Sequence, residues 1–211
     1  MKIIVNILII AILFIGGCAS GRAESHSRAG YNFSMLDSVA VVAVEGALQS
    51  QAAKDQIAEY FEMELLKKGY APKEWANVSA ALKEQEVQAS DLNTEAGVAE
   101  AAEIINVPAI LIVNIPHFGN EIFITAKMVD VTDGSVLWIG SGTSKTGGWL
   151  SLGSGWGSGA REENELFGGV QGGVMGGGVA AYALSPKEAE QAHRLIRRMC
   201  NTLPSRLTTE W

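Results

Sequence analysis

Residues 121–138 read EIFITAKMVDVTDGSVLW, and this stretch decides the fold. Its first half alternates, with Ile122, Ile124, Ala126 and Met128 at every second position. This is the pattern of a strand that buries one face. Residues 132–135, Thr-Asp-Gly-Ser, then predict a tight turn. Because an Asp-Gly pair between two apolar runs is a strong hairpin signal, the stretch predicts two antiparallel strands.

Two further segments are predicted to be strands that are buried on both faces. Residues 39–44 read VAVVAV, and residues 109–115 read AILIVNI. Short, nearly unbroken apolar runs rich in β-branched residues are typical of strands covered by helices on both sides.

Four helices are predicted from apolar periodicity and capping residues. The first covers residues 52–68, where Ile57, Phe61 and Leu65 recur every four positions and Gly69 suits the position after the helix. Asn77 is a candidate cap for a second, short helix, and Thr94 for a third that ends near residue 105. The last helix runs from Pro186 to about residue 203, because proline is favoured in a first turn.

The order of these elements predicts an α/β fold. A strand, helices, three strands and a final helix form a two-layer or three-layer sandwich, in which helices flank a mixed sheet. We expect one domain, made of residues 37–142 and 185–207. A Gly-rich insert at 143–184 interrupts it before the C-terminal helix.

The N-terminus predicts an address in the cell envelope. Residues 1–17 have one positive charge at Lys2, a short apolar run and then two glycines, as in a secretory signal, and the run is too short to span a bilayer. The sequence Ile-Gly-Gly-Cys at 15–18 resembles the bacterial lipobox. That resemblance implies cleavage after Gly17 and a diacylglycerol on Cys18, and Ala19 in the next position favours the outer membrane. Residues 18–36 show no apolar period, so we interpret them as a lipidated, flexible tether.

Composition excludes several classes of partner and chemistry. With 16 Lys and Arg against 23 Asp and Glu, the net charge is −7, which argues against binding to nucleic acid. His26, His117 and His193 are scattered, so no cluster has the spacing of metal ligands. We predict no catalytic residue, no metal and no cofactor. Cys200, the second cysteine, is interpreted as a small buried hydrophobe rather than a reactive thiol.

The insert at 143–184 is the unusual part of the chain, since residues 142–178 hold 14 of the 24 glycines. Three interpretations stay open. It is a flexible loop; or a hairpin with long arms and a charged tip that enters the membrane as part of a shared barrel; or a helix packed through glycines that recur every four residues. The candidate membrane or oligomer contacts are Trp149, Leu150, Leu152, Trp156, Phe167, Gly169, Gly173 and Gly177.

Several local patterns together resemble the curli-secretion-channel (CsgG) family of outer-membrane lipoproteins. They are the lipobox at Cys18, the strand at 39–44, the helix end at 65–70 and residues 108–113. The most specific is the hairpin at 126–138, which looser relatives share, such as penicillin-binding-protein activators (LpoB) and the N-terminal domain of TolB. The resemblance implies a mixed sheet with flanking helices, and subunits that each give two hairpins to a common barrel. The first hairpin would arise at 117–120, where this chain has only a tight turn.

Two hypotheses for function follow. In the first, the chain is a non-enzymatic outer-membrane lipoprotein whose domain faces the periplasm. It forms a homo-oligomer within a secretion or envelope-assembly system, for a cargo or partner that the sequence does not name. In the second, it is a monomeric periplasmic lipoprotein that binds and activates a partner such as a peptidoglycan synthase.

Overall fold

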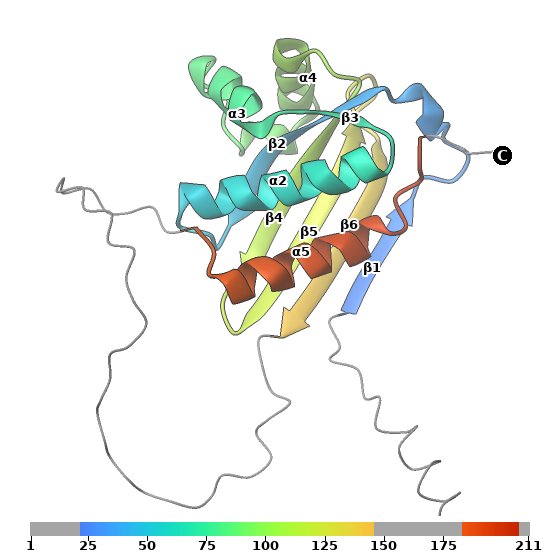
Figure 1. The fold of residues 1–211 in the computed structure, drawn as a ribbon. Coiled ribbons are helices and arrows are strands. Elements are labelled where there is room, and N and C mark those ends of the chain that lie inside the picture. Colours follow the sequence, from blue (N-terminus) through green and yellow to red (C-terminus); the bar gives the residue numbers. More distant parts are fainter. Residues whose placement is uncertain (1–21, 146–182, 207–211) are drawn as a thin grey trace, which may run out of the picture.

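The computed structural model describes residues 22–145 and 183–206, and these form an α/β sandwich around one six-stranded mixed sheet (Figure 1). The strand order is β1-β6-β5-β4-β2-β3. The strands are β1 (Arg22–Ser27), β2 (Ser38–Gly46), β3 (Ala71–Lys73), β4 (Ala109–His117), β5 (Glu121–Asp130) and β6 (Val136–Lys145). The helices are α2 (Gln51–Lys67), α3 (Trp75–Glu84), α4 (Glu95–Ile105) and α5 (Pro186–Cys200), with 3-10 turns η1 (Phe33–Met35) and η2 (Asp91–Asn93).

Helices cover both faces of the sheet, which confirms the predicted fold class. Helices α2 and α5 pack side by side on one face (Figure 1) and enclose the larger core, which includes Phe61, Leu195 and Trp138. Helices α3 and α4 pack on the opposite face over β2 and β4, around Leu82, Val98 and similar residues. The described residues are therefore three layers deep where β2 and β4 lie, and two layers deep over β5, β6 and β1.

The hairpin predicted at 121–138 is confirmed as β5 and β6, which pair antiparallel from Glu121–Lys145 to Val129–Val136. Ile122, Ile124, Ala126 and Met128 are all at most 2% exposed and face the larger core. The alternation was therefore a reliable guide to which face of the strand is buried. Strand β4 ends at His117, and only three residues separate it from β5. This short connection agrees with the tight turn predicted at 117–120.

The predicted tether at 18–36 is wrong from Arg22 onward. Residues 22–27 form β1, which pairs antiparallel with β6 from Arg22–Thr143 to Ser27–Trp138. The strand carries small residues toward α5: the Ser25 hydroxyl donates to the Met199 carbonyl oxygen over 2.9 Å. A polar segment becomes a strand here because β6 offers a free edge and α5 covers its inner side. The 3-10 turn η1 then buries Phe33 in the larger core.

The second helix begins earlier than its predicted cap, Asn77. Helix α3 starts at Trp75 after Glu74, and the backbone N–H of Trp75 donates to Glu62 Oε1 over 2.6 Å. The cap is thus supplied by a carboxylate of α2, and Asn77 instead donates its side-chain N–H to Glu74. A cap that comes from a residue 13 positions away leaves no local signal in the sequence. Strand β3, three residues long and containing Pro72, was also not predicted.

The other predicted helix boundaries hold. Thr94 caps α4 by accepting from Gly97 N–H, and α2 is followed by Gly69 in the left-handed region at φ 86°. Pro186 opens α5, which ends at Cys200, slightly before the predicted end.

Helix α5 has a complete capping box, which yields a prediction of stability. The Ser185 hydroxyl oxygen accepts from Glu188 N–H, and the Glu188 carboxylate accepts from Ser185 N–H over 3.0 Å. We expect Ser185→Ala to lower the free energy of unfolding by about 1 kcal/mol. The Glu188 N–H loses its acceptor, and the reciprocal bond from the Ser185 N–H to the Glu188 carboxylate is no longer part of a closed pair. Urea unfolding followed by circular dichroism measures this. Ser79→Ala, which alters a hydroxyl in the middle of α3, is the matched control and should have a smaller effect.

Candidate functional site

All the site residues predicted from the sequence lie outside the described residues. These are Gly17 and Cys18 at the N-terminus and, in the insert, Trp149, Leu150, Leu152, Trp156, Phe167, Gly169, Gly173 and Gly177. The three interpretations of the insert therefore stay open. The structure instead defines the positions from which these two segments leave the domain.

Both segments leave from the same end of the sheet. Because Arg22 is paired with Thr143, the start of β1 lies beside the end of β6, where the insert begins (Figure 1). Strands β2 and β4 run parallel to each other, and β6 runs the same way because two antiparallel pairings separate it from β4. The carboxyl ends of these three strands therefore share one end of the sheet with Arg22.

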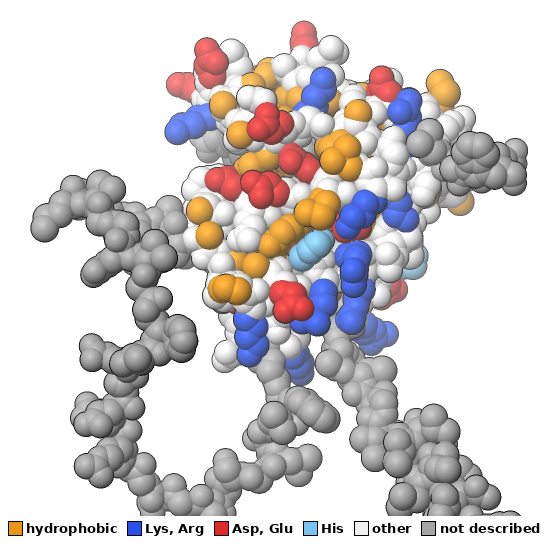
Figure 2. Space-filling view, in the orientation of Figure 1, with side chains coloured by type: hydrophobic (Ala, Val, Ile, Leu, Met, Phe, Trp, Pro, Cys, Tyr) orange, Lys and Arg blue, Asp and Glu red, His pale blue; other side chains and the backbone are white. Residues whose placement is uncertain are grey.

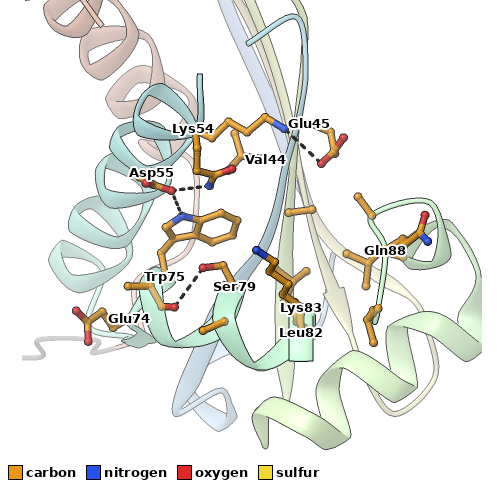
Figure 3. Close-up of a pocket in the computed structure, with 18 of the residues that line it drawn as sticks. Val44, Glu45, Lys54, Asp55, Glu74, Trp75, Ser79, Leu82, Lys83 and Gln88 are labelled. Carbon is orange, nitrogen blue, oxygen red and sulfur yellow. Dashed lines mark hydrogen bonds and ion pairs between the residues drawn. The ribbon is translucent and has the colours of Figure 1, made fainter. Parts of the chain in front are cut away.

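A large cleft lies between α2 and α3, and we call it the α2–α3 cleft (Figure 3). Its volume is about 1090 Å³, and its floor is the second half of β2, from Val42 to Glu45. One wall is the first half of α2, and the other is α3 with the loop after it. The crossover from β2 leads to α2 on one face of the sheet, while β3 leads to α3 on the opposite face. Crevices of this kind, at the carboxyl ends of neighbouring strands whose connections diverge, are common binding sites in α/β proteins.

Trp75 is fixed between the two walls by carboxylates of α2. Its indole Nε1–H donates to Asp55 Oδ1 over 2.7 Å, and the side chain of Gln51 donates to the same oxygen (Figure 3). Its backbone N–H is held by Glu62, as described above. Burial raises the pKa of Glu62, and the neighbouring carboxylates Glu59 and Glu74 raise it further. The cleft therefore combines a rigid aromatic wall with a concentration of negative charge.

Charge is divided between two regions of the surface (Figure 2). Asp and Glu side chains gather over α3 and the first half of α2, whereas Lys and Arg side chains gather along α5. The basic residues of α5 are Lys187, Arg194, Arg197 and Arg198. The domain is thus electrically polarised, with the basic region on the side of the larger core.

The interface between α2 and α5 contains the buried polar residues of the described chain. Glu64, which is 4% exposed, accepts from Lys67 Nζ over 2.6 Å and lies 3.5 Å from His193 Nε2. The His193 ring stacks on Tyr60 with 4.8 Å between centroids. These contacts join the two helices. We assign them a structural role.

Cys200 is buried in the same interface, as predicted, and is 1% exposed. Burial raises the pKa of its thiol to about 12, and the carboxylate of Glu64 adds to the rise. Since the thiolate is the reactive form, we expect Cys200 to resist alkylation by iodoacetamide at pH 8 in the folded protein and to react once urea unfolds it. Mass spectrometry of the alkylated peptide distinguishes the two states. Rapid labelling of the folded chain would contradict the buried position.

One face of the sheet is left uncovered in the described part of the chain. It is the face of β5, β6 and β1 that lies opposite α5. Ile139 is 47% exposed there, and its cross-strand neighbours are Lys127 on β5 and His26 on β1. Half-buried side chains on the same face are Phe123, Thr125, Ser141 and Thr143.

Residues 22–145 and 183–206 contain no group of three or more His, Cys, Asp or Glu side chains placed to hold a metal ion. Within the same ranges, no helix has the length and apolar character needed to cross a bilayer.

Sequence reasoning missed the α2–α3 cleft, although part of its signal is present. Asp55, Glu59 and Glu62 are spaced by four and three residues, which places their carboxylates on one side of a helix. That spacing could have indicated an acidic helix face. The opposite wall could not be inferred, because it depends on the face of the sheet to which α3 leads from β3.

Comparison with known proteins gives similarity at the level of the fold. No protein-family model matches the chain, and no curated protein sequence matches it. Among solved structures, PelC from Paraburkholderia phytofirmans, solved as a dodecamer, is 17% identical, with a TM-score of 0.48, covering 89% of this chain and 100% of PelC. A lipoprotein from Neisseria meningitidis is 21% identical, with a TM-score of 0.47, covering 56% of this chain and 86% of that protein.

The C-terminal domain of LpoB from Escherichia coli is 15% identical, with a TM-score of 0.42, covering 56% of this chain and 88% of that domain. None of the structures named here is a curli secretion channel, so that resemblance stays a prediction. At these values the similarity assigns no activity or partner to this chain.

Proposed function

We propose that this chain is a non-enzymatic lipoprotein of the outer membrane, lipidated at Cys18, whose domain faces the periplasm. The observation that carries the proposal is the position of β1. Only residues 19–21 lie between Cys18 and the first residue of the sheet, Arg22. Four backbone steps reach at most about 14 Å, so a lipid on Cys18 would hold this end of the sheet close to the bilayer surface.

The same geometry would place the start of the insert near the membrane. Because Lys145 ends β6 beside the start of β1, the chain enters residues 146–182 from the end of the sheet nearest the lipid. We propose that this insert contacts the membrane or neighbouring subunits, with the aromatic residues Trp149 and Trp156 among the contacts. The basic side chains of α5 would favour an anionic surface, each by roughly 1 kcal/mol when it lies close to the headgroups.

We further propose that the chain acts as a homo-oligomer in a secretion or envelope-assembly system, as the resemblance to the curli secretion channel implies. The uncovered face of β5, β6 and β1, with Ile139 exposed at its centre, supports association with a second copy. On this face no helix of the described chain covers the sheet, so contact with another chain would bury Ile139 and the half-buried Phe123 beside it.

Native mass in detergent tests the oligomer. We expect a particle of several subunits after mild extraction, and a mass near that of a single mature chain, which lacks residues 1–17, would contradict it. Deletion of residues 147–180 tests the insert, with Cys18 kept so that the lipid remains. If both the oligomer and the membrane conductance survive this deletion, the insert has no role in either, and the shared-barrel hypothesis is wrong.

The second candidate function is a monomeric lipoprotein that regulates a partner enzyme, such as a peptidoglycan synthase. The α2–α3 cleft favours it, because an open cleft with a fixed tryptophan suits recognition of a partner. Affinity capture with the lipidated chain tests partner binding. One variant lacks the Lys and Arg side chains of α5, and a second has the cleft blocked. Loss of capture only in the second variant separates partner binding from membrane contact.

A further inference from the structure

The floor of the α2–α3 cleft is an unpaired sheet edge. Strand β3 pairs with β2 only from Ser38–Ala71 to Ala40–Lys73. Beyond Ala40, the same edge of β2 continues to Gly46, and no strand pairs with it in the described part of the chain. An unpaired edge of this kind has backbone N–H and C=O groups positioned to bond another strand.

The helices on either side protect this edge of β2 from pairing with another sheet, but they leave space beside it. Helices α2 and α3 stand on either side of it, so another folded sheet cannot approach (Figure 3). A single extended segment can enter, because the cleft volume of about 1090 Å³ slightly exceeds the roughly 300–1,000 Å³ typical of binding sites. The lining contains apolar groups for alternate side chains, namely Val44 on the floor and Trp75, Leu82 and Val87 on the wall.

The charge of the lining selects the segment. Six acidic residues line the cleft, against two lysines, Lys54 and Lys83; the six are Glu45, Asp55, Glu59, Glu62, Glu74 and Glu86. Asp55 and Glu62 are engaged with Trp75, and Glu45 lies 3.8 Å from Lys54 Nζ. The side-chain carboxylates of Glu59 and Glu86 have no hydrogen-bond or ion-pair partner among the described residues. Cationic side chains entering from outside would therefore meet uncompensated carboxylates.

We propose that the α2–α3 cleft binds an extended, Lys- or Arg-bearing segment of a partner protein as an added strand along β2, in line with β3. Main-chain hydrogen bonds to β2 give affinity, and alternate side chains meet the apolar wall and the carboxylates. The proposal requires a peptide rather than a small cation, because only a peptide satisfies an unpaired strand edge. It does not depend on lipidation at Cys18 or on the oligomer.

The test uses the full chain in detergent and a probe peptide, acetyl-(Val-Lys)₃-amide, measured by isothermal titration calorimetry. We expect saturable binding with one site per chain. The matched peptide acetyl-(Val-Glu)₃-amide should bind at least tenfold more weakly, because it brings carboxylates to an acidic cleft. Absence of binding by the lysine peptide, or equal binding by the two peptides, would overturn the proposal.

Variants in the protein locate the site. Ala76→Trp places a large side chain in the cleft from an exposed position on α3, and we expect it to weaken peptide binding at least tenfold. The control is Ala99→Trp, an exposed position on α4 outside the cleft. The double change Glu59→Gln and Glu86→Gln keeps the side-chain size and should weaken binding about fivefold, since each exposed charge contributes modestly. Glu100→Gln with Glu103→Gln is its control. Equal effects of cleft and control variants would place the site elsewhere.

A third comparison separates strand addition from simple charge attraction. Two isomers of the lysine peptide, N-methylated at every Val or at every Lys, each remove the N–H groups from one edge of the extended chain. We expect one isomer to lose binding at least tenfold while the other retains it. If neither isomer loses affinity, or if spermidine binds as tightly as the peptide, the cleft responds to charge alone and the strand proposal is wrong.

Discussion

A chain carrying Cys18→Ser is expected to lose its lipid and to leave the membrane fraction. The thiol of Cys18 is the proposed site of diacylglycerol attachment, and a serine hydroxyl does not replace it in the lipobox. Each buried CH₂ of an acyl chain contributes about 0.8 kcal/mol, so loss of the chains removes the dominant membrane affinity of an acidic protein. Membrane fractionation and intact-mass measurement together detect the change.

The control for this experiment is a substitution of the second cysteine, Cys200. Cys200 is the other cysteine of the chain and is buried beneath α2, so Cys200→Ala should leave the lipid and the membrane location unchanged. A Cys18→Ser chain that keeps both its lipid mass and its membrane location would show that Cys18 is not the anchor. That result would leave the α2–α3 cleft proposal intact, because the two rest on different residues.

Gly46→Ala is expected to destabilise the domain by about 3–5 kcal/mol, through backbone strain combined with a close contact that cannot relax. Gly46 ends β2 at φ +109°, a conformation that side chains disfavour. A Cβ added there would lie 2.2 Å from the carbonyl oxygen of Ile115 on β4. That oxygen already accepts from Ala47 N–H over 2.7 Å, so it is not free to move. Urea unfolding followed by circular dichroism gives the change.

Gly30→Ala separates the two causes. Gly30 also has a positive φ, +76°, but an added Cβ meets nothing within 4 Å. We therefore expect Gly30→Ala to lower the free energy of unfolding by about 1 kcal/mol, because only the backbone conformation is disfavoured. If the two substitutions destabilise the chain equally, the close approach of β2 and β4 at Ile115 has no energetic consequence.

The sequence predicted the elements whose signal is local. The alternation from Ile122 to Met128 identified β5 and its buried face, and the Thr94 and Pro186 positions identified two helix starts. In each case the residues that carry the signal also make the contact. Apolar periodicity and capping residues are then sufficient to predict the element.

Strand β1 was missed because its partner is distant. The segment RAESHS has no apolar period, and its stability comes from β6, more than 110 residues later, and from α5. A weaker signal was present. Charged or polar side chains at Arg22, Glu24 and His26 alternate with the small residues Ala23 and Ser25, which suits an edge strand lying under a closely packed helix.

The α2–α3 cleft could not be predicted from the sequence for a different reason. Its existence depends on β3 being only three residues long and on the two crossovers leaving to opposite faces. Both are properties of topology. Even the start of α3 at Trp75 depends on a carboxylate of α2, which a local analysis does not identify.

With the proposed lipid on Cys18, the short link to β1 would also limit how far from the membrane the domain can reach. A compact domain of about 150 residues is roughly 40 Å across, and the link adds about 14 Å, so every surface stays within roughly 55 Å of the lipid. A longer tether would let the domain search the width of the periplasm. Here the lipidated chain would be confined to a thin layer, and a partner for the cleft would have to bring its segment into that layer.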